Sequence, residues 1–320
     1  MNNLCRLLGI DIPILAAPTG SIAGPELAAA VSAAGGLGAM GLTWTSPEIA
    51  AGWVRQVKVQ TCRPFQVNFA LAFSPVALDE ILDAGAPVIT FSWGDPAPYM
   101  ERVRAAGAKI GIQVTNALGA RRAIDLGADF LICQGIEAGG HVQSSTSLAD
   151  LLPTVVAEAG DLPVAAAGGI AASTSIAQVL SLGAQGAVLG TRFVATQESR
   201  AHDDYKQRLL AAASGQTALT SCFDIGWPQA QHGVLRNSTL ETWEAYGCPP
   251  HGQRPGEGNE VAYTASGEPI LRYEDTAPQQ GMTGDIEAMC LYAGRGVGAI
   301  NDLPKAGELV RRLWADASAG

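Results

Sequence analysis

The sequence predicts an α/β fold, a (β/α)8 TIM barrel with a small, largely helical capping insertion after the eighth strand. Three observations lead to this fold class. Short apolar runs that end in glycine or a polar residue alternate with alanine-rich helical stretches. The runs number eight and recur about every 25 residues, a spacing that suits a closed barrel. After Thr191 this alternation stops.

The predicted strands are short and apolar. They lack strict alternation of polar and apolar residues, as expected where helices cover a parallel sheet and side chains fill the barrel interior. We expect them at residues 13–18, 37–42, 64–70, 88–93, 109–114, 130–134, 164–168 and 187–190.

Start and stop signals frame the helices between these strands. Proline and capping residues favour a first helical turn, and glycine favours a helix end. The start signals are Pro25, Ser46-Pro47, Ser74-Pro75, Asn116 and Ser173. The stop signals are Gly35-Gly36, Gly85, Gly107, Gly127 and Gly183.

A doubly wound sheet is the rival fold. It usually carries a glycine-rich turn after its first strand, whereas this chain reads Pro18-Thr19-Gly20-Ser21 there. A GxGxxG match at Gly36, Gly38 and Gly41 follows a helix and lies inside a strand, so we interpret it as fortuitous. The barrel is therefore favoured.

Three segments follow from this pattern. Residues 1–199 form the barrel, 200–282 a capping insertion that shapes the substrate pocket, and 283–320 a helical segment that returns to the barrel. Within the insertion we expect a helix at Asp203–Ser214 and irregular chain after it.

Composition excludes several classes of protein. Of the 320 residues 48% are hydrophobic and 16% charged, which indicates a globular chain. The net charge of −10, without a basic run, argues against nucleic-acid binding. No apolar run reaches the length of a membrane span, and Gly9, Asp11 and Pro13 interrupt the N-terminal stretch, so we expect neither a span nor a signal peptide.

The six cysteines show no CxxC pair and no zinc-ligand spacing. We expect reduced, mostly buried thiols, a cytoplasmic location and no metal site.

Two glycine-containing pairs follow the last two predicted strands. Gly168-Gly169 and Gly190-Thr191 present bare backbone N–H groups at the barrel end that commonly holds a phosphate. Glycine matters there because a Cβ would block close approach. The alternative is that these residues only turn a strand into a helix.

His141 is the candidate for proton transfer. It follows Gly139 and Gly140 on the loop after the sixth strand, where the backbone is free to lie against a planar ligand. Alternatively, it only donates a hydrogen bond. The other histidines are expected at the surface: His202, His232 and His251.

Asn68 and Gln113 each place an amide at or near the C-terminal end of an apolar strand. An amide offers a donor and an acceptor without net charge, which suits the edge of a heteroaromatic ring. Each could equally satisfy loop backbone.

At these residues the chain resembles a known family. The segments are PILAAPTG, FQVNFAL, GADFLICQGIEAGGH, PVAAAGGI, GAVLGTRF and LYAGRGVG. They resemble the nitronate monooxygenases, formerly called 2-nitropropane dioxygenases, which are FMN-dependent barrels with a small capping domain. EAGGH followed by AAGGI and LGT is typical of the family and less specific for one activity.

The resemblance implies an FMN-dependent oxidoreductase with His141 as catalytic residue. Such an enzyme oxidises alkyl nitronates, and in some cases nitroalkanes, with O2 to a carbonyl compound and nitrite. The implied partners are this small-molecule substrate and O2, and homo-oligomer formation stays open. The implied FMN-binding residues are Ala17, Pro18, Thr19, Asn68, Gln113, Gly139, Gly140, Ala167, Gly168, Gly169, Gly190 and Thr191.

The chain departs from the family pattern at three places. Many relatives have Met at the position of Thr19, Arg-Gly at Val142-Gln143 and Gln at Arg295. These changes put the substrate in doubt. Two alternatives remain: an FMN-dependent NAD(P)H reductase of the enoyl-acyl-carrier-protein or quinone reductase type, and a non-redox barrel such as a phosphosugar isomerase.

Overall fold

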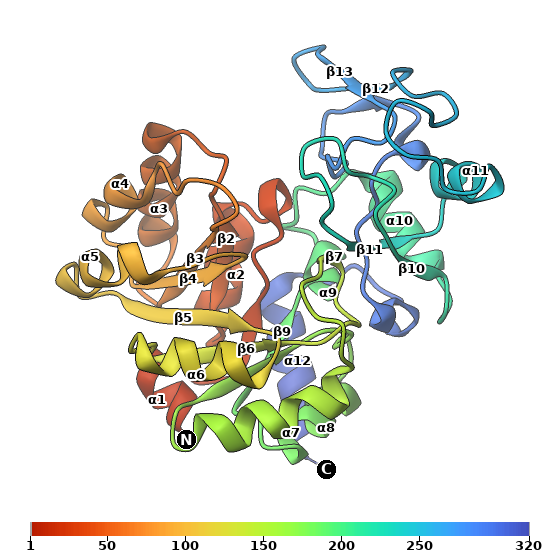
Figure 1. Cartoon of the computed structure of the whole chain (residues 1–320). Helices are drawn as coiled ribbons and strands as arrows, with labels where there is room; N and C mark the ends of the chain where they lie inside the picture. The colour runs from red at the N-terminus through yellow and green to blue at the C-terminus, as the bar shows by residue number, and fades with distance from the viewer. Residues whose placement is uncertain (1, 320) are drawn as a thin grey trace.

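The computed structural model describes residues 2–319 and contains an eight-stranded parallel barrel (Figure 1). A parallel bridge between Leu15 and Leu37 joins the first and last strands of the sheet and closes the ring. The barrel prediction is therefore confirmed. In spatial order the strands are β1 (Ile14–Ala16), β9 (Gly186–Leu189), β8 (Val164–Ala167), β6 (Phe130–Gln134), β5 (Lys109–Val114), β4 (Val88–Ser92), β3 (Phe65–Ala70) and β2 (Gly38–Gly41).

Helices connect these strands and surround them. Pro25 and Pro47 are the first residues of their helices, and the Asn116 side chain accepts a hydrogen bond from the Gly119 N–H at 2.7 Å. The helices are α2 (Pro25–Ala33), α3 (Pro47–Gln60), α4 (Leu78–Asp83), α5 (Met100–Ala105), α6 (Ala117–Asp125), α7 (Leu148–Ala159), α8 (Ser173–Ser181) and α9 (Thr191–Val194). The predicted glycine stops Gly35, Gly85, Gly107, Gly127 and Gly183 all have positive φ.

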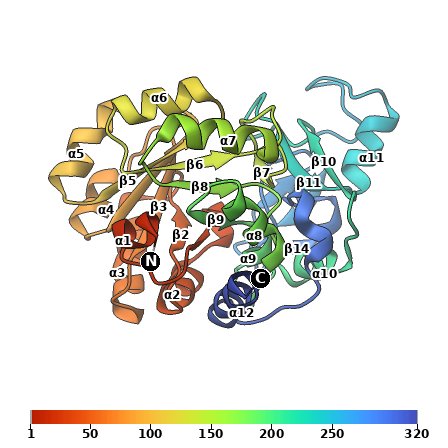
Figure 2. The same ribbon diagram turned by 90° about the horizontal axis from the view of Figure 1, so that it is seen from below.

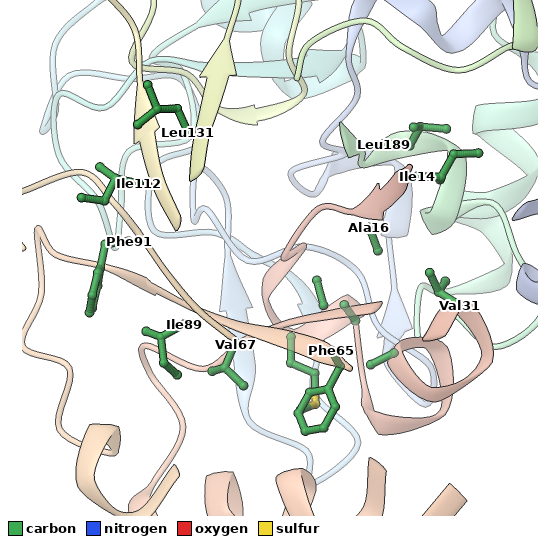
Figure 3. Close-up of a cluster of buried hydrophobic side chains, with 14 of the residues drawn as sticks. Ile14, Ala16, Val31, Phe65, Val67, Ile89, Phe91, Ile112, Leu131 and Leu189 are labelled. Atoms are coloured by element: carbon green, nitrogen blue, oxygen red, sulfur yellow. The ribbon is translucent and has the colours of Figure 1, made fainter. Parts of the chain in front are cut away.

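Alternate side chains of each strand face the helices. On β3 and β4 these are Phe65, Val67, Ile89 and Phe91, which belong to the largest apolar cluster (Figure 3). Residues between them, such as Asn68, face the barrel interior because successive side chains on a strand point to opposite faces.

A short helix fills the N-terminal end of the barrel. Leu4 and Leu8 of α1 (Asn3–Leu8) pack with interior side chains that include Leu15 and Phe130. Figure 2, which views the molecule from below, shows α1 beside the strands at this end. This end of the barrel is therefore filled, and the carboxyl termini of the strands lie at the opposite end.

The prediction of a largely helical insertion needs correction. Residues 200–282 contain two helices, α10 (Asp203–Ala211) and α11 (Ser238–Ala245), but also four strands: β10 (Thr217–Thr220), β11 (His232–Leu235), β12 (Glu260–Tyr263) and β13 (Pro269–Leu271). β11 pairs with β10 and with β7 (Gly140–His141) of the barrel loop, and β12 pairs with β13 and with β14 (Thr283–Gly284). Short strands with remote partners leave little periodic signal in sequence.

The last helix returns to the barrel. Leu309 and Leu313 of α12 (Ala306–Ser318) join the main apolar cluster, where α12 packs against α2 and α8.

All six cysteines are free and four are buried, in agreement with the prediction. Among residues 2–319, no helix combines the length and apolar character that a membrane crossing requires.

Candidate active site

A cavity of about 690 Å³ opens at the carboxyl ends of the barrel strands. Every residue that the sequence singled out for catalysis or cofactor binding lines it, although they come from six different barrel strands and the loops that follow. They are Ala17, Pro18, Thr19, Asn68, Gln113, Gly139, Gly140, His141, Ala167, Gly168, Gly169, Gly190 and Thr191.

The two glycine-containing pairs form one wall of the cavity. Gly168 and Gly169 have φ of +125° and +67°, a region that L side chains rarely adopt. Within residues 2–319, the N–H groups of Gly168, Gly169, Gly190 and Thr191 donate no hydrogen bond to the protein. Four neighbouring donors are therefore available to one anion, and this arrangement could hold a phosphate.

No lysine or arginine side chain lines this cavity among the described residues. An anion at the glycine wall would thus be bound without a positively charged side chain from the described residues. No group of three or more histidine, cysteine or acidic side chains that could hold a metal ion gathers in the same residues.

His141 is fixed by contacts from the insertion. It pairs with His232 in the β7–β11 ladder, and its ring stacks on Trp227 with centroids 4.2 Å apart. Its Nε2 is buried and has no hydrogen-bond partner among the described residues. Burial lowers the pKa of His141 to about 3, and the nearby His232 contributes to the decrease. The imidazole is therefore neutral at physiological pH.

The prediction that His232 lies at the surface is wrong. Its side chain is fully buried, and burial lowers its pKa to about 4. The Phe223 N–H donates to Nε2 at 3.3 Å, so Nδ1 carries the proton and donates to the Ala230 carbonyl at 2.9 Å. His202 and His251 are less buried, as expected: one caps α10 and the other is exposed.

The side-chain amides of Asn68 and Gln113, which also line the cavity, have carbonyl oxygens that are free to accept hydrogen bonds. The Asn68 Nδ2 donates to Thr90, and the Gln113 Nε2 donates to Gln143 Oε1 at 2.9 Å. Because these donors are used, the carbonyl oxygens of Asn68 and Gln113 remain to accept hydrogen bonds from a ligand.

Gln143 connects three parts of the site. Besides Gln113, its Oε1 accepts from the Trp93 N–H at 3.2 Å, and its own N–H donates to Gln134 Oε1 at 3.0 Å. Trp93 has a φ of +60°, which is uncommon for a bulky residue. This glutamine, one of the departures from the family pattern, therefore supports the strand ends around His141.

Several lining residues were missed by the sequence interpretation. Trp227 and Asp275 come from the insertion, and Tyr292, Gly294 and Gly296 from the closing segment. A Cβ on Gly294 would lie 2.9 Å from the Gly139 N, and one on Gly296 would lie 2.2 Å from the Gly169 O. The motif LYAGRGVG was a signal that could have placed this segment against the two loops.

Comparison with known proteins identifies the family. The family model described as nitronate monooxygenase matches residues 2–79 and 74–316. The chain belongs to the nitronate monooxygenase family. It is therefore an oxidoreductase, as the resemblance in its sequence implied.

Relatives of this nitronate monooxygenase family member carry different names. A nitronate monooxygenase of Paraburkholderia phytofirmans is 30% identical, and the match covers 82% of this chain and 82% of that protein. The Mycobacterium tuberculosis protein named (3aS,4S,5R,7aS)-5-hydroxy-7a-methyl-1-oxo-octahydro-1H-indene-4-carboxyl-CoA dehydrogenase is 32% identical, covering 98% of this chain and 95% of that one.

Among solved structures, FabK from Thermotoga maritima has a TM-score of 0.84 at 28% identity and covers 100% of this chain and 96% of its own. Proteins similar to this chain are thus named for different reactions.

Proposed function

We propose that this protein is an FMN-dependent oxidoreductase that oxidises alkyl nitronates with O2 to a carbonyl compound and nitrite. One observation carries the proposal: a neutral histidine with a buried Nε2 and four free backbone donors of the described residues line the same cavity. Membership of the nitronate monooxygenase family supports it.

The lining residues fit FMN. The N–H groups at Gly168, Gly169, Gly190 and Thr191 would bind its phosphate. The carbonyl oxygens of Asn68 and Gln113 would accept hydrogen bonds from its N–H or hydroxyl groups. The remaining residues of the proposed site that would border FMN are Ala17, Pro18, Thr19, Gly139, Gly140 and Ala167.

FMN would supply the redox chemistry, taking electrons from the substrate and passing them to O2. His141 would supply the acid–base chemistry, accepting the α-proton when the substrate is a neutral nitroalkane. The burial that keeps this imidazole neutral also makes it a weak base. A preformed nitronate needs no proton transfer, so we expect it to be the better substrate.

An absorbance spectrum and oxygen-uptake measurements test the proposal. We expect the purified protein to bind FMN and to consume O2 with propyl nitronate, releasing nitrite. A protein that takes up no FMN would instead support the non-redox barrel.

His141→Asn tests the base directly. We expect turnover of neutral nitropropane to fall by about 100-fold, within the range of general base catalysis, and turnover of propyl nitronate to fall much less. Steady-state rates with both substrates are the measurement. His202→Asn is the matched control, because His202 caps α10 outside the cavity and asparagine is also a good cap. Equal losses on the two substrates would exclude the base role.

A reductase that uses NAD(P)H is the second candidate. The similarity to FabK and to the dehydrogenase, each over nearly the whole chain, favours it. Mixing the FMN-loaded protein with NADH under anaerobic conditions separates the two functions. Rapid loss of the yellow colour supports the reductase, and a persistent colour supports the nitronate monooxygenase.

A further inference from the structure

Asp275, in the insertion, places a carboxyl group on the wall of the cavity, and neither the family resemblance nor the proposed reaction uses it. The ionisable side chains that line the cavity in the described residues are His141, Asp275 and Tyr292. His141 is neutral, and burial raises the pKa of Tyr292. Asp275 is therefore the one of these that can carry a full charge near neutral pH.

The backbone around Asp275 fixes the position of this carboxyl group. Its N–H donates to the Ile225 carbonyl at 3.0 Å, and its carbonyl accepts from the Tyr292 hydroxyl at 2.8 Å. A Cβ on Gly226 would lie 2.2 Å from the Asp275 Oδ1, so the carboxyl group occupies the space that a side chain at position 226 would need.

No lysine or arginine in residues 2–319 forms an ion pair with Asp275. Its pKa is raised to about 6, chiefly by burial, and the carboxylates of Glu274 and Asp224 contribute to this increase. A half-buried charge without a partner costs free energy unless a ligand supplies a hydrogen-bond donor.

An aromatic wall lies close to this carboxyl group. Trp227, which follows Gly226, packs against Phe73, Trp93 and Trp44 with ring centroids 5.1, 4.7 and 5.9 Å apart, and all four line the cavity. Trp44 is 59% exposed, although it is a large apolar side chain. Such a wall suits the apolar body of a substrate.

We propose that Asp275 determines substrate choice in this cavity. Its carboxylate would accept a hydrogen bond from a hydroxyl or ammonium group of a substrate whose apolar body lies on the aromatic wall. It would repel a substrate with a carboxylate at that place. This inference rests on the proposed function, because it concerns the substrate of the same site.

Three probes with one aromatic body test the inference without any turnover: phenylpropylamine, phenylpropanol and phenylpropanoate. Calorimetric titration of the protein at neutral pH, with and without added FMN, gives their affinities. We expect the amine and the alcohol to bind at least about ten-fold more tightly than the carboxylate. This is the size of effect expected for one charged hydrogen bond.

Asp275→Asn should reduce this preference to about three-fold or less, since an amide bears no charge. Glu274→Gln is the matched control: Glu274 is the neighbouring carboxylate, does not line the cavity and accepts from the Leu271 N–H, which Gln can also do. We expect it to keep the wild-type order.

A carboxylate probe that binds wild type as tightly as the amine overturns the inference, even if Asp275→Asn does not fold. An unchanged preference in Asp275→Asn also overturns it. If the probes behave as expected but no nitronate is oxidised, the proposed function fails and the inference about Asp275 stands.

Discussion

The environment of His141 makes its protonation state a property of the fold. Trp227, Tyr292 and His232 all lie within 6 Å of it, measured between ring centroids. None of them offers a negative charge that would stabilise an imidazolium ion. As the pH decreases, the free energy of unfolding therefore falls before His141 becomes protonated in the folded protein.

We expect stability to fall as the pH decreases below about 6.5, the ordinary histidine pKa. The folded-state pKa values are about 3 for His141 and about 4 for His232, so the unfolded chain binds more protons in this range. Urea unfolding of wild type and His141→Asn at about pH 7.5 and about pH 5 measures the effect.

His141→Asn should lose less unfolding free energy on acidification than wild type, because one of the two histidines is gone. Asp275, with its pKa raised to about 6, acts in the opposite direction in both proteins and cancels in the comparison. An equal loss in the two proteins would contradict the assignment of His141 as a buried neutral group.

At the residue scale, sequence reasoning worked where the barrel itself determines position. Gly168, Gly190 and Asn68 were found because parallel strands of a barrel end at one rim. Trp227 and Asp275 could not be found that way, since the insertion that carries them has no regular period.

At the scale of elements, the pairing of β7 with β11 joins the barrel to the insertion. Gly233 lies opposite Gly140 in this ladder. A Cβ on Gly233 would be 2.4 Å from the Ala138 carbonyl oxygen and 3.2 Å from the Gly139 Cα. The absence of a side chain at position 233 is therefore what lets the loop before His141 lie against β11.

We expect Gly233→Ala to displace this loop and to lower nitronate oxidation by about 100-fold, the cost of a misplacement of about 1 Å. Far-ultraviolet circular dichroism should show an intact barrel. In the control Gly52→Ala the added methyl group in α3 meets no atom within 4 Å, so activity should be unchanged. Wild-type activity in Gly233→Ala would show that the ladder does not position His141.

The eight barrel strands and their glycine stops were predictable, because each strand is followed by a local signal for the next helix. β10 and β11 were not predictable. β10 pairs with β11, and β11 pairs with the two-residue strand Gly140–His141, which is far away in the chain. A pairing of the latter kind depends on tertiary contacts rather than on local sequence.

At the scale of the whole molecule, three parts of the chain enclose one cavity: the barrel, the insertion through Trp227 and Asp275, and the closing segment through Gly294 and Gly296. A ligand that contacts all three parts should hold them together and stabilise the protein as a unit.

We expect added FMN to raise the thermal midpoint of unfolding. The unfolding free energy should increase by about 2.7 kcal/mol when free FMN is 100 times its Kd. Gly190→Ala should need about ten-fold more FMN for the same shift, because its methyl group would lie at the cavity wall, 3.4 Å from the Ala17 Cβ. Thermal melts over a series of FMN concentrations measure this.

Without FMN, Gly190→Ala should melt like wild type, because the added Cβ makes only ordinary contacts. Gly52→Ala again serves as the control and should respond to FMN like wild type. The same midpoint shift in Gly190→Ala as in wild type would argue against phosphate binding at this wall.

No basic side chain of residues 2–319 lines the glycine wall, and this has a consequence for tolerance to mutation. Amide hydrogens belong to the main chain and are common to every residue type except proline. Mutation of nearby side chains therefore alters the shape of this wall but not its polarity. Alkaline solution, which would discharge a lysine, leaves these donors as they are.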